Sequence, residues 1–168
     1  MLVVTDTTPI NYLVLIGHVD ILPSLYSHVV IPQAVLGDLQ HPRTPEIVRE
    51  WIATPPSWCT IQSPQGPPDP TLLYLGDGER EALMLFQELG ADAVLTDDSE
   101  AYEEAQRRGI PVLRTLGILE QASLHRLLDL PTALARLQTT TFYAPSHVIS
   151  AMLARHTARQ SPLKGPEA

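Results

Sequence analysis

The chain has 168 residues, 44% of them hydrophobic, so it is long enough to bury one sizeable core and short for two. Its 11 Lys and Arg against 19 Asp and Glu give a formal net charge of −8, which excludes the broad basic surface of a general nucleic-acid binder. Any contact with nucleic acid must therefore be local or mediated by cations. The one cysteine, Cys59, excludes an intrachain disulfide and a Cys-rich zinc site, and we expect a reducing, cytoplasmic location.

The N-terminal half alternates between strand and helix patterns. Leu2 to Val4 predicts a short apolar strand, without the basic start and long apolar run of a signal peptide. The threonines that follow, with Pro9, predict a helix from about Pro9 to Ile16 that ends at Gly17. The elements expected next are a helical stretch at 19–25, a β-branched strand at 29–31, a helix at 32–39, a helix at 43–52 and a strand at 58–61.

The C-terminal half begins with the clearest helical periodicity of the chain, from Asp77 to Leu89, which ends at Gly90. The elements expected after it are a strand at 93–95, a helix at 99–108, a strand at 110–113, helices at 116–127 and 131–137, and a last helix at 145–159. No segment has the roughly 18 consecutive apolar residues of a membrane-spanning helix, so we expect no membrane contact.

Short, wholly apolar strands that alternate with helices predict an α/β protein. We expect a three-layer α/β/α sandwich around a short parallel central sheet. Residues 1–158 should form a single domain, and residues 159–168 have the composition of a flexible C-terminal tail.

Acidic residues follow two of the predicted strands. Asp6 comes after the first strand, and Asp97 and Asp98 come after the strand at 93–95. The carboxyl ends of parallel strands line the crevice in which ligands bind, so these carboxylates should project into one place. The alternative is that Asp6 and Asp98 only cap the helices that follow, because Asp is a preferred N-cap residue. Two acidic strand ends in one sheet favour a site.

A third acid comes from helical geometry. In a helix at 77–89, Glu79 shares the apolar face of Ala82, Leu83 and Phe86, where an unpaired carboxylate is expensive to bury. It should therefore meet a partner or a cation, although an acid in the first turn also suits the helix dipole. For Glu81, on a more mixed face, the dipole is the preferred explanation. Asp38, near a helix C-terminus, is a fourth candidate, with a solvent-facing position as its alternative.

Several carboxylates without a matching Lys or Arg would repel one another and raise each other's pKa values. A divalent cation between them would resolve this repulsion. Oxygen ligands favour hard ions, so the sequence predicts Mg²⁺ or Mn²⁺. The six histidines show no spacing typical of metal ligands, such as H-x-x-x-H.

Four segments, in this order and spacing, carry a family resemblance: Val4-Thr5-Asp6-Thr7-Thr8-Pro9, Ile31-Pro32-Gln33-Ala34-Val35, Leu75-Gly76-Asp77-Gly78-Glu79-Arg80-Glu81-Ala82 and Leu95-Thr96-Asp97-Asp98. Together they resemble the PIN domain, and more narrowly its DUF3368 branch, whose members are similar to VapC-type toxins of bacterial toxin–antitoxin pairs. The resemblance runs from about Leu2 to Ala158. It implies a parallel sheet flanked by helices, a Mg²⁺ or Mn²⁺ site, and phosphodiester hydrolysis, usually of RNA.

The resemblance also implies roles for single residues. Asp6, Glu79 and Asp97 match the family's acids and would be the metal ligands, with Asp98 beside them as a further catalytic residue. Thr7 and Thr8 lie where the family has a hydroxyl near the first Asp. Asp38 lies where many members have Glu, and these three residues would support the ligands. For the whole protein the resemblance implies homodimers and, for toxins, inhibition by a small antitoxin that reaches into the acidic groove.

These inferences combine into a mechanistic hypothesis. One or two ions held by the three acids would lower the pKa of a bound water and neutralise phosphate charge, while Asp98 or Thr7 orients the water. Candidates for contacts with the RNA backbone are Arg80, Arg107, Arg108 and Arg114, each with a solvated surface charge as its alternative.

Three other classes of protein share parts of this pattern. A receiver-type domain would need paired acids after the first strand and a late lysine, but the pair comes late and the only lysine is Lys164. A HAD-type phosphatase would need a second Asp where Thr8 stands. The remaining alternative is a PIN-like protein that no longer cleaves and acts as a nucleic-acid or protein binding module, which Asp38 in place of Glu and the acidic surface favour.

Overall fold

The computed structural model describes residues 1–161 of the chain. At its centre is a five-stranded sheet in the order β3-β2-β1-β4-β5, and every neighbouring pair of strands is parallel. The predicted α/β architecture with a parallel central sheet is therefore confirmed. The strands are β1 (Leu2–Thr5), β2 (His28–Pro32), β3 (Cys59–Gln62), β4 (Ala93–Leu95) and β5 (Val112–Leu113).

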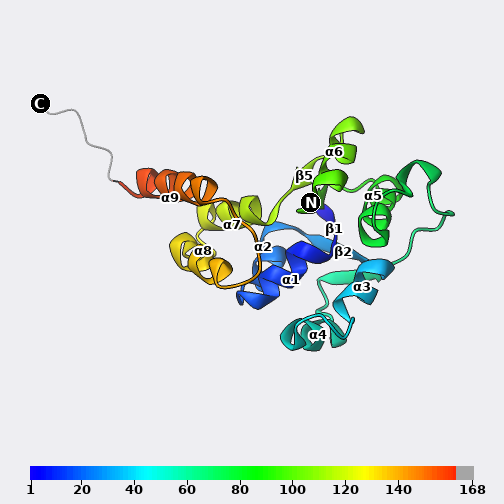
Figure 1. The fold of residues 1–168 in the computed structure, drawn as a ribbon, viewed down its shortest axis with the longest axis horizontal. Helices are drawn as coiled ribbons and strands as arrows, with labels where there is room; N and C mark the ends of the chain where they lie inside the picture. The colour runs from blue at the N-terminus through cyan, green and yellow to red at the C-terminus, as the bar shows by residue number, and fades with distance from the viewer. Residues whose placement is uncertain (162–168) are drawn as a thin grey trace, which may run out of the picture.

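Helices connect the strands and cover both faces of the sheet (Figure 1). Their bounds are α1 (Thr7–Leu15), η1 (Val19–Ile21), α2 (Leu22–Leu25), α3 (Gln33–Leu39), α4 (Glu46–Ala53), η2 (Pro70–Leu72), α5 (Asp77–Leu89), α6 (Ser99–Arg107), α7 (Thr115–Leu124), α8 (Leu130–Gln138) and α9 (Ser146–Gln160), where η marks a 3₁₀ helix.

Alternate residues of the strands enter two separate hydrophobic cores, as the period of two in a strand requires. Val3 and Leu95 point into the larger core, which α1 to α4 and α7 to α9 complete. Val4 and Val94 point into the smaller one, where α5 and α6 lie. Figure 1 shows the two groups of helices apart, with α7, α8 and α9 together on the left of the sheet and α5 and α6 on the right. Within residues 1–161, no helix is long and apolar enough to cross a membrane.

Most predicted elements form, with shifted ends. The first helix begins at Thr7 rather than Pro9, because Asp6, and not a threonine, is its N-cap and accepts a hydrogen bond from the backbone of Thr8. The helix expected at 43–52 begins only after Pro45, because a proline disfavours helical backbone at the residue before it. The strand expected at 110–113 is reduced to two residues, because Pro111 lacks the N–H that a ladder needs.

At the C-terminal end, α9 continues to Gln160, so the first two residues of the expected tail are helical. Ser161 is the C-cap of this helix, and residues 162–168 of the expected tail lie outside the described residues.

Four helix ends share one turn, in which a residue with positive φ follows the helix. Glycine occupies it after α1, α5 and α6, at Gly17, Gly90 and Gly109. After α7 the same turn is made by Arg126, with φ 58°, and the N–H of Leu127 reaches back to the carbonyl of Ala122. The expected end of this helix at Leu127 was wrong, because no glycine marks the turn.

Candidate active site

The carboxyl ends of β1 and β4 lie side by side at the point where the strand order of the sheet reverses. From β1 the chain moves outward to β2 and β3 on one side, and then to β4 and β5 on the other. Thr5 is in register with Leu95, and the N–H of Asp6 donates to the carbonyl of Leu95 at 2.9 Å. Such a switch point is where open parallel sheets bind ligands. The topology therefore brings Asp6 and Asp97 to the same edge of the sheet, as the strand-end pattern predicted.

Asp6 is the most deeply buried of the acids, with 1% of its surface exposed. Its Oδ1 accepts from the backbone N–H of Thr8 at 3.2 Å, and its Oδ2 accepts from the hydroxyl of Thr96. Burial raises its pKa well above the ordinary value, the Thr96 hydroxyl opposes this, and the charges of Glu79 and Asp97 raise the pKa further. The carboxylate is thus fixed in place and short of positive charge.

Asp97 is held by the first residue of α7. Both the backbone N–H and the hydroxyl of Thr115 donate to its carboxylate, at 3.0 and 2.5 Å. Burial raises the pKa of Asp97, while the bonds from Thr115 and the nearby charge of Arg114 lower it. Asp97 therefore caps the N-terminus of α7, although it is distant from this helix in sequence.

Glu79 lies in the first turn of α5, as the helical pattern predicted. Its carboxylate folds back against Gly76, where any Cβ would collide with Oε2. Burial raises its pKa, its own backbone N–H opposes this, and the charges of Asp98, Asp38 and Asp77 raise it further. Glu81 has a different role, because its Oε2 accepts from the N–H of Ala34 at 2.8 Å and so caps the start of α3.

The two remaining acids border the same place. Asp98 is the N-cap of α6 and accepts from the N–H of Ala101 at 2.8 Å, so the helix-cap alternative holds for it as it does for Asp6. Asp38 accepts from the hydroxyl of Thr7 at 2.8 Å. A Cβ at Gly78 would lie 3.1 Å from a methyl group of Val35, beside Asp38 Oδ2 at 3.4 Å, so this glycine lets α5 approach α3 closely.

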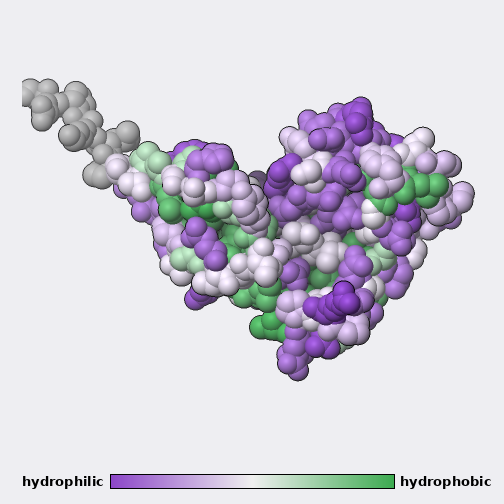
Figure 2. All heavy atoms as spheres, viewed as in Figure 1, coloured by the Kyte–Doolittle hydropathy of each residue, from purple (hydrophilic) through white to green (hydrophobic). Residues whose placement is uncertain are grey.

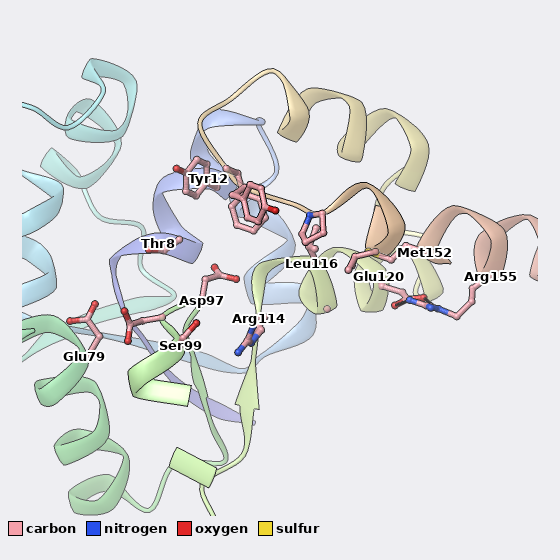
Figure 3. Close-up of a pocket in the computed structure, with 16 residues that line it drawn as sticks. Thr8, Tyr12, Glu79, Asp97, Ser99, Arg114, Leu116, Glu120, Met152 and Arg155 are labelled. Carbon is pink, nitrogen blue, oxygen red and sulfur yellow. Dashed lines mark hydrogen bonds and ion pairs between the residues drawn. The ribbon is translucent and has the colours of Figure 1, made fainter. Parts of the chain in front are cut away.

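A pocket of about 840 Å³ opens above these groups. Figure 2 shows it as a hollow between mainly hydrophilic residues on the α5–α6 side and a mixture of hydrophobic and hydrophilic residues on the α7–α9 side. Glu79, Asp97, Asp98, Thr8 and Ser99 line its acidic end, and Figure 3 shows Glu79, Asp97 and Ser99 together there. Asp6 does not line the pocket but lies within electrostatic reach of Glu79 and Asp97.

Three of the four arginines predicted to contact RNA are engaged elsewhere. Arg80 pairs with Asp77 at 2.6 Å. Arg107 and Arg108 both pair with Glu104, at 2.6 and 2.8 Å, in a network that ties the proline-rich segment before α5 to α6. Of these four, Arg114 alone lines the pocket, with its guanidinium 4.2 Å from the centre of the Tyr102 ring.

Sequence reasoning overlooked the hydroxyls that hold the acids. Thr96 also accepts from the N–H of Asp98 at 3.1 Å, so it joins the two acidic strand ends. Thr115 follows β5 at the same distance in sequence as Asp97 follows β4, and a polar residue at a third strand end was the signal that could have identified it. The apolar end of the pocket, with Tyr12, Phe142 and Tyr143, comes from α1 and the segment between α8 and α9, which no local pattern joins.

The donor set suits a hard divalent cation, because the buried Asp6 and its neighbours Glu79 and Asp97 offer oxygen atoms alone. As the side chains stand, no group of three or more His, Cys, Asp or Glu within residues 1–161 is close enough together to hold a metal.

A parallel α/β sheet with an acidic crevice at its switch point defines the class of this protein. The family model described as DUF3368: PIN domain matches residues 2–158, and the chain belongs to this family. No curated protein and no solved structure matches it. PIN domains are generally nucleases and typically use divalent metals, so the fold is that of a nuclease.

Proposed function

We propose that this protein is a Mg²⁺- or Mn²⁺-dependent endoribonuclease that hydrolyses phosphodiester bonds, and that it is the toxin of a toxin–antitoxin pair. The observation that carries the enzymatic part is the convergence of Asp6 and Asp97 from the two central strands, with Glu79 close enough to raise the pKa of Asp6. Carboxylates this buried and this close to like charges favour a site that a cation completes.

Asp6, Glu79 and Asp97 would hold the metal. A bound divalent ion lowers the pKa of a coordinated water and neutralises phosphate charge. The protein contributes rigidity, because Thr96 and the Thr8 amide fix Asp6, and Thr115 fixes Asp97. Thr7, held by Asp38, and Asp98, fixed at the start of α6, would orient a water or a substrate oxygen at the rim.

Arg114 would contact the substrate phosphates. Its guanidinium is positioned by the Tyr102 ring and lines the same pocket as the acids. The starts of α1, α5, α6 and α7 carry the acids or their partners, so four positive helix ends also face this region. These groups reduce, without cancelling, the repulsion between an acidic protein and RNA, so RNA binding should depend on the metal.

Cleavage of a single-stranded RNA by purified protein tests the enzymatic proposal. We expect cleavage with Mg²⁺ or Mn²⁺, its loss with EDTA, and its loss in both Asp6→Asn and Asp97→Asn. Asp20→Asn is the matched control, because Asp20 is exposed in η1 outside the pocket. Full activity in Asp6→Asn or Asp97→Asn would refute the assignment.

A binding module without catalysis is the second candidate. It is favoured by the capping roles of the acids, since Asp6, Asp97 and Asp98 each accept hydrogen bonds from the start of a helix and so have a structural reason to be present. Calorimetric titration with Mn²⁺ separates the two candidates. A protein that binds no divalent ion at millimolar concentration cannot be the proposed nuclease.

The toxin part of the proposal is supported by membership of the PIN family and by the motifs that resemble VapC-type toxins. It includes a homodimer and a small antitoxin as partners. Sedimentation of the purified chain tests the dimer. Co-expression with the product of a short adjacent gene tests the antitoxin, which should co-purify and abolish cleavage.

A further inference from the structure

The pocket continues well beyond the acidic residues. Its other end is mainly apolar and aromatic, formed by Tyr12 of α1, Leu116 of α7, Met152 of α9, and Phe142 and Tyr143 from the segment between α8 and α9. It also includes Glu120 and Arg155, which form an ion pair with each other at 2.8 Å. In Figure 3, Leu116 and Met152 lie away from the cluster of Glu79, Asp97 and Ser99, Tyr12 lies above that cluster, and Arg114 lies beside Ser99. None of these apolar side chains has a part in holding a metal.

Within this end, the segment that carries Tyr143 is anchored by its neighbours. Phe142 packs edge-on against Tyr12, with ring centres 5.0 Å apart and an angle of 81° between the rings. The Tyr12 hydroxyl and the Thr141 hydroxyl are hydrogen-bonded at 2.8 Å, and the N–H of Phe142 donates to Thr140. The segment is thus fixed to α1, the helix that Asp6 caps.

Tyr143, next in the chain, is not packed. It is 85% exposed, more than any other large hydrophobic side chain in residues 1–161. Leaving an aromatic ring in water gives up the stabilisation that its burial would provide. Thr141 and Phe142, in the same segment, contact Tyr12, so the exposure of Tyr143 is specific to this position.

We propose that Tyr143 is a stacking platform for an unpaired nucleobase of the nucleic acid whose phosphate lies at the acidic end. This rests on the proposed nuclease function. An exposed ring, a guanidinium at Arg114 and a cation-dependent acidic end in one pocket match base, phosphate and scissile bond in turn. A duplex would not fit this arrangement, because its bases are stacked on one another and cannot reach the ring.

Binding of a single-stranded oligoribonucleotide that contains 2-aminopurine tests the proposal. The wild-type protein, in Mg²⁺, is mixed rapidly with the probe, so that the fluorescence change on stacking is recorded before products form. We expect Tyr143→Ala to weaken binding by about 5- to 150-fold and to abolish most of the fluorescence change. Tyr143→Phe keeps the ring and should bind like wild type. Leu124→Ala is the control, because Leu124 is 56% exposed and lies outside this pocket.

Three results would overturn the stacking proposal: equal affinity of Tyr143→Ala and wild type, equal affinity for the probe and for its duplex, or no binding of the probe by wild type. The nuclease proposal fails separately. Binding that depends on Tyr143 without any cleavage would keep the platform and reject the enzyme. If Tyr143→Ala cleaves with the same rate and KM as wild type, the nuclease proposal stands and the stacking proposal is rejected.

Discussion

Replacing Asp6 by asparagine should stabilise the protein while abolishing its response to divalent metal. Asn is as good an N-cap as Asp, so α1 keeps its cap through the N–H of Thr8. The amide can also face Thr96, whose hydroxyl already accepts from Asp98 and has a second lone pair. What the substitution removes is a buried negative charge whose pKa is raised by burial and by two neighbouring carboxylates.

The expected gain follows from these opposing terms. The lost hydrogen bond from the Thr96 hydroxyl costs about 1 kcal/mol. Relief of the buried charge exceeds it, and we expect a net stabilisation of about 1–2 kcal/mol, as is usual when a strained functional group is removed. For a chain of this length that corresponds to a rise in Tm of about 2–8 °C in the absence of metal.

Metal should then reverse the order of stability. A ligand present at about 100 times its Kd stabilises the folded state by about 2.7 kcal/mol, so Mn²⁺ should raise the Tm of the wild type by about 5–11 °C. Asp6→Asn lacks one of the three proposed ligands and should show little or no rise. Thermal unfolding followed by circular dichroism, with EDTA and then with millimolar Mn²⁺, measures both effects in one experiment.

Two outcomes would contradict this reasoning. If Asp6→Asn is less stable than wild type in EDTA, the carboxylate contributes more as a structural cap than its charge costs. If Mn²⁺ stabilises both proteins equally, the ion binds elsewhere. Asp20→Asn, which removes an exposed charge, should match wild type in both conditions.

Three further predictions concern the scaffold. Arg126→Gly should stabilise the protein by about 0.5–1 kcal/mol in urea unfolding, because glycine relieves the positive φ at the end of α7, whereas Arg126→Ala should bring no gain. Gly37→Ala should stabilise α3 by up to about 1 kcal/mol, because a Cβ there meets nothing within 4 Å, but Gly78→Ala should lose that benefit, because its Cβ would lie 3.1 Å from a methyl group of Val35. The hydrogen bonds from Tyr74, Arg108 and Arg107 lower the pKa of Glu104 from 4.5 to about 2. The stabilisation that Glu104 contributes is therefore complete above pH 4.5 and is lost as the pH falls toward 2. Urea midpoints measured at each pH should show a flatter stability profile in this range for Glu104→Gln.

The sequence was sufficient for the sheet and for the acids at its edge. Apolar strands of three or four residues that each run into a helix have few arrangements other than a parallel sheet, and in such a sheet the ends of β1 and β4 meet by topology. Glu79 could be placed because the periodicity of α5 is strong and its predicted bounds, Asp77 to Leu89, are those observed. These predictions needed only local pattern and general rules of connection.

The parts that escaped prediction depend on contacts between distant residues. Thr115 bonds to Asp97 across 18 residues, and Tyr12 meets Thr141 across 129. Nothing in the local sequence of either pair shows the other partner. The arginines could not be sorted from the sequence either. Arg107 and Arg108 pair with Glu104, one helical turn earlier. Only the fold shows that Arg114 faces the pocket.

The helix-cap explanation and the functional explanation of the acids turn out to be compatible. In a parallel sheet each strand is followed by a helix whose N-terminus lies at the carboxyl edge, so an acid placed there caps a helix and faces the crevice at once. Asp6 and Asp98 cap α1 and α6, Asp97 closes α7, and Glu79 sits in the first turn of α5. The helix ends stabilise each carboxylate singly, but Asp6 still has its pKa raised by burial and by Glu79 and Asp97. Capping therefore explains how the acids are tolerated without lysines, and it leaves the remaining repulsion as the part that a cation would relieve.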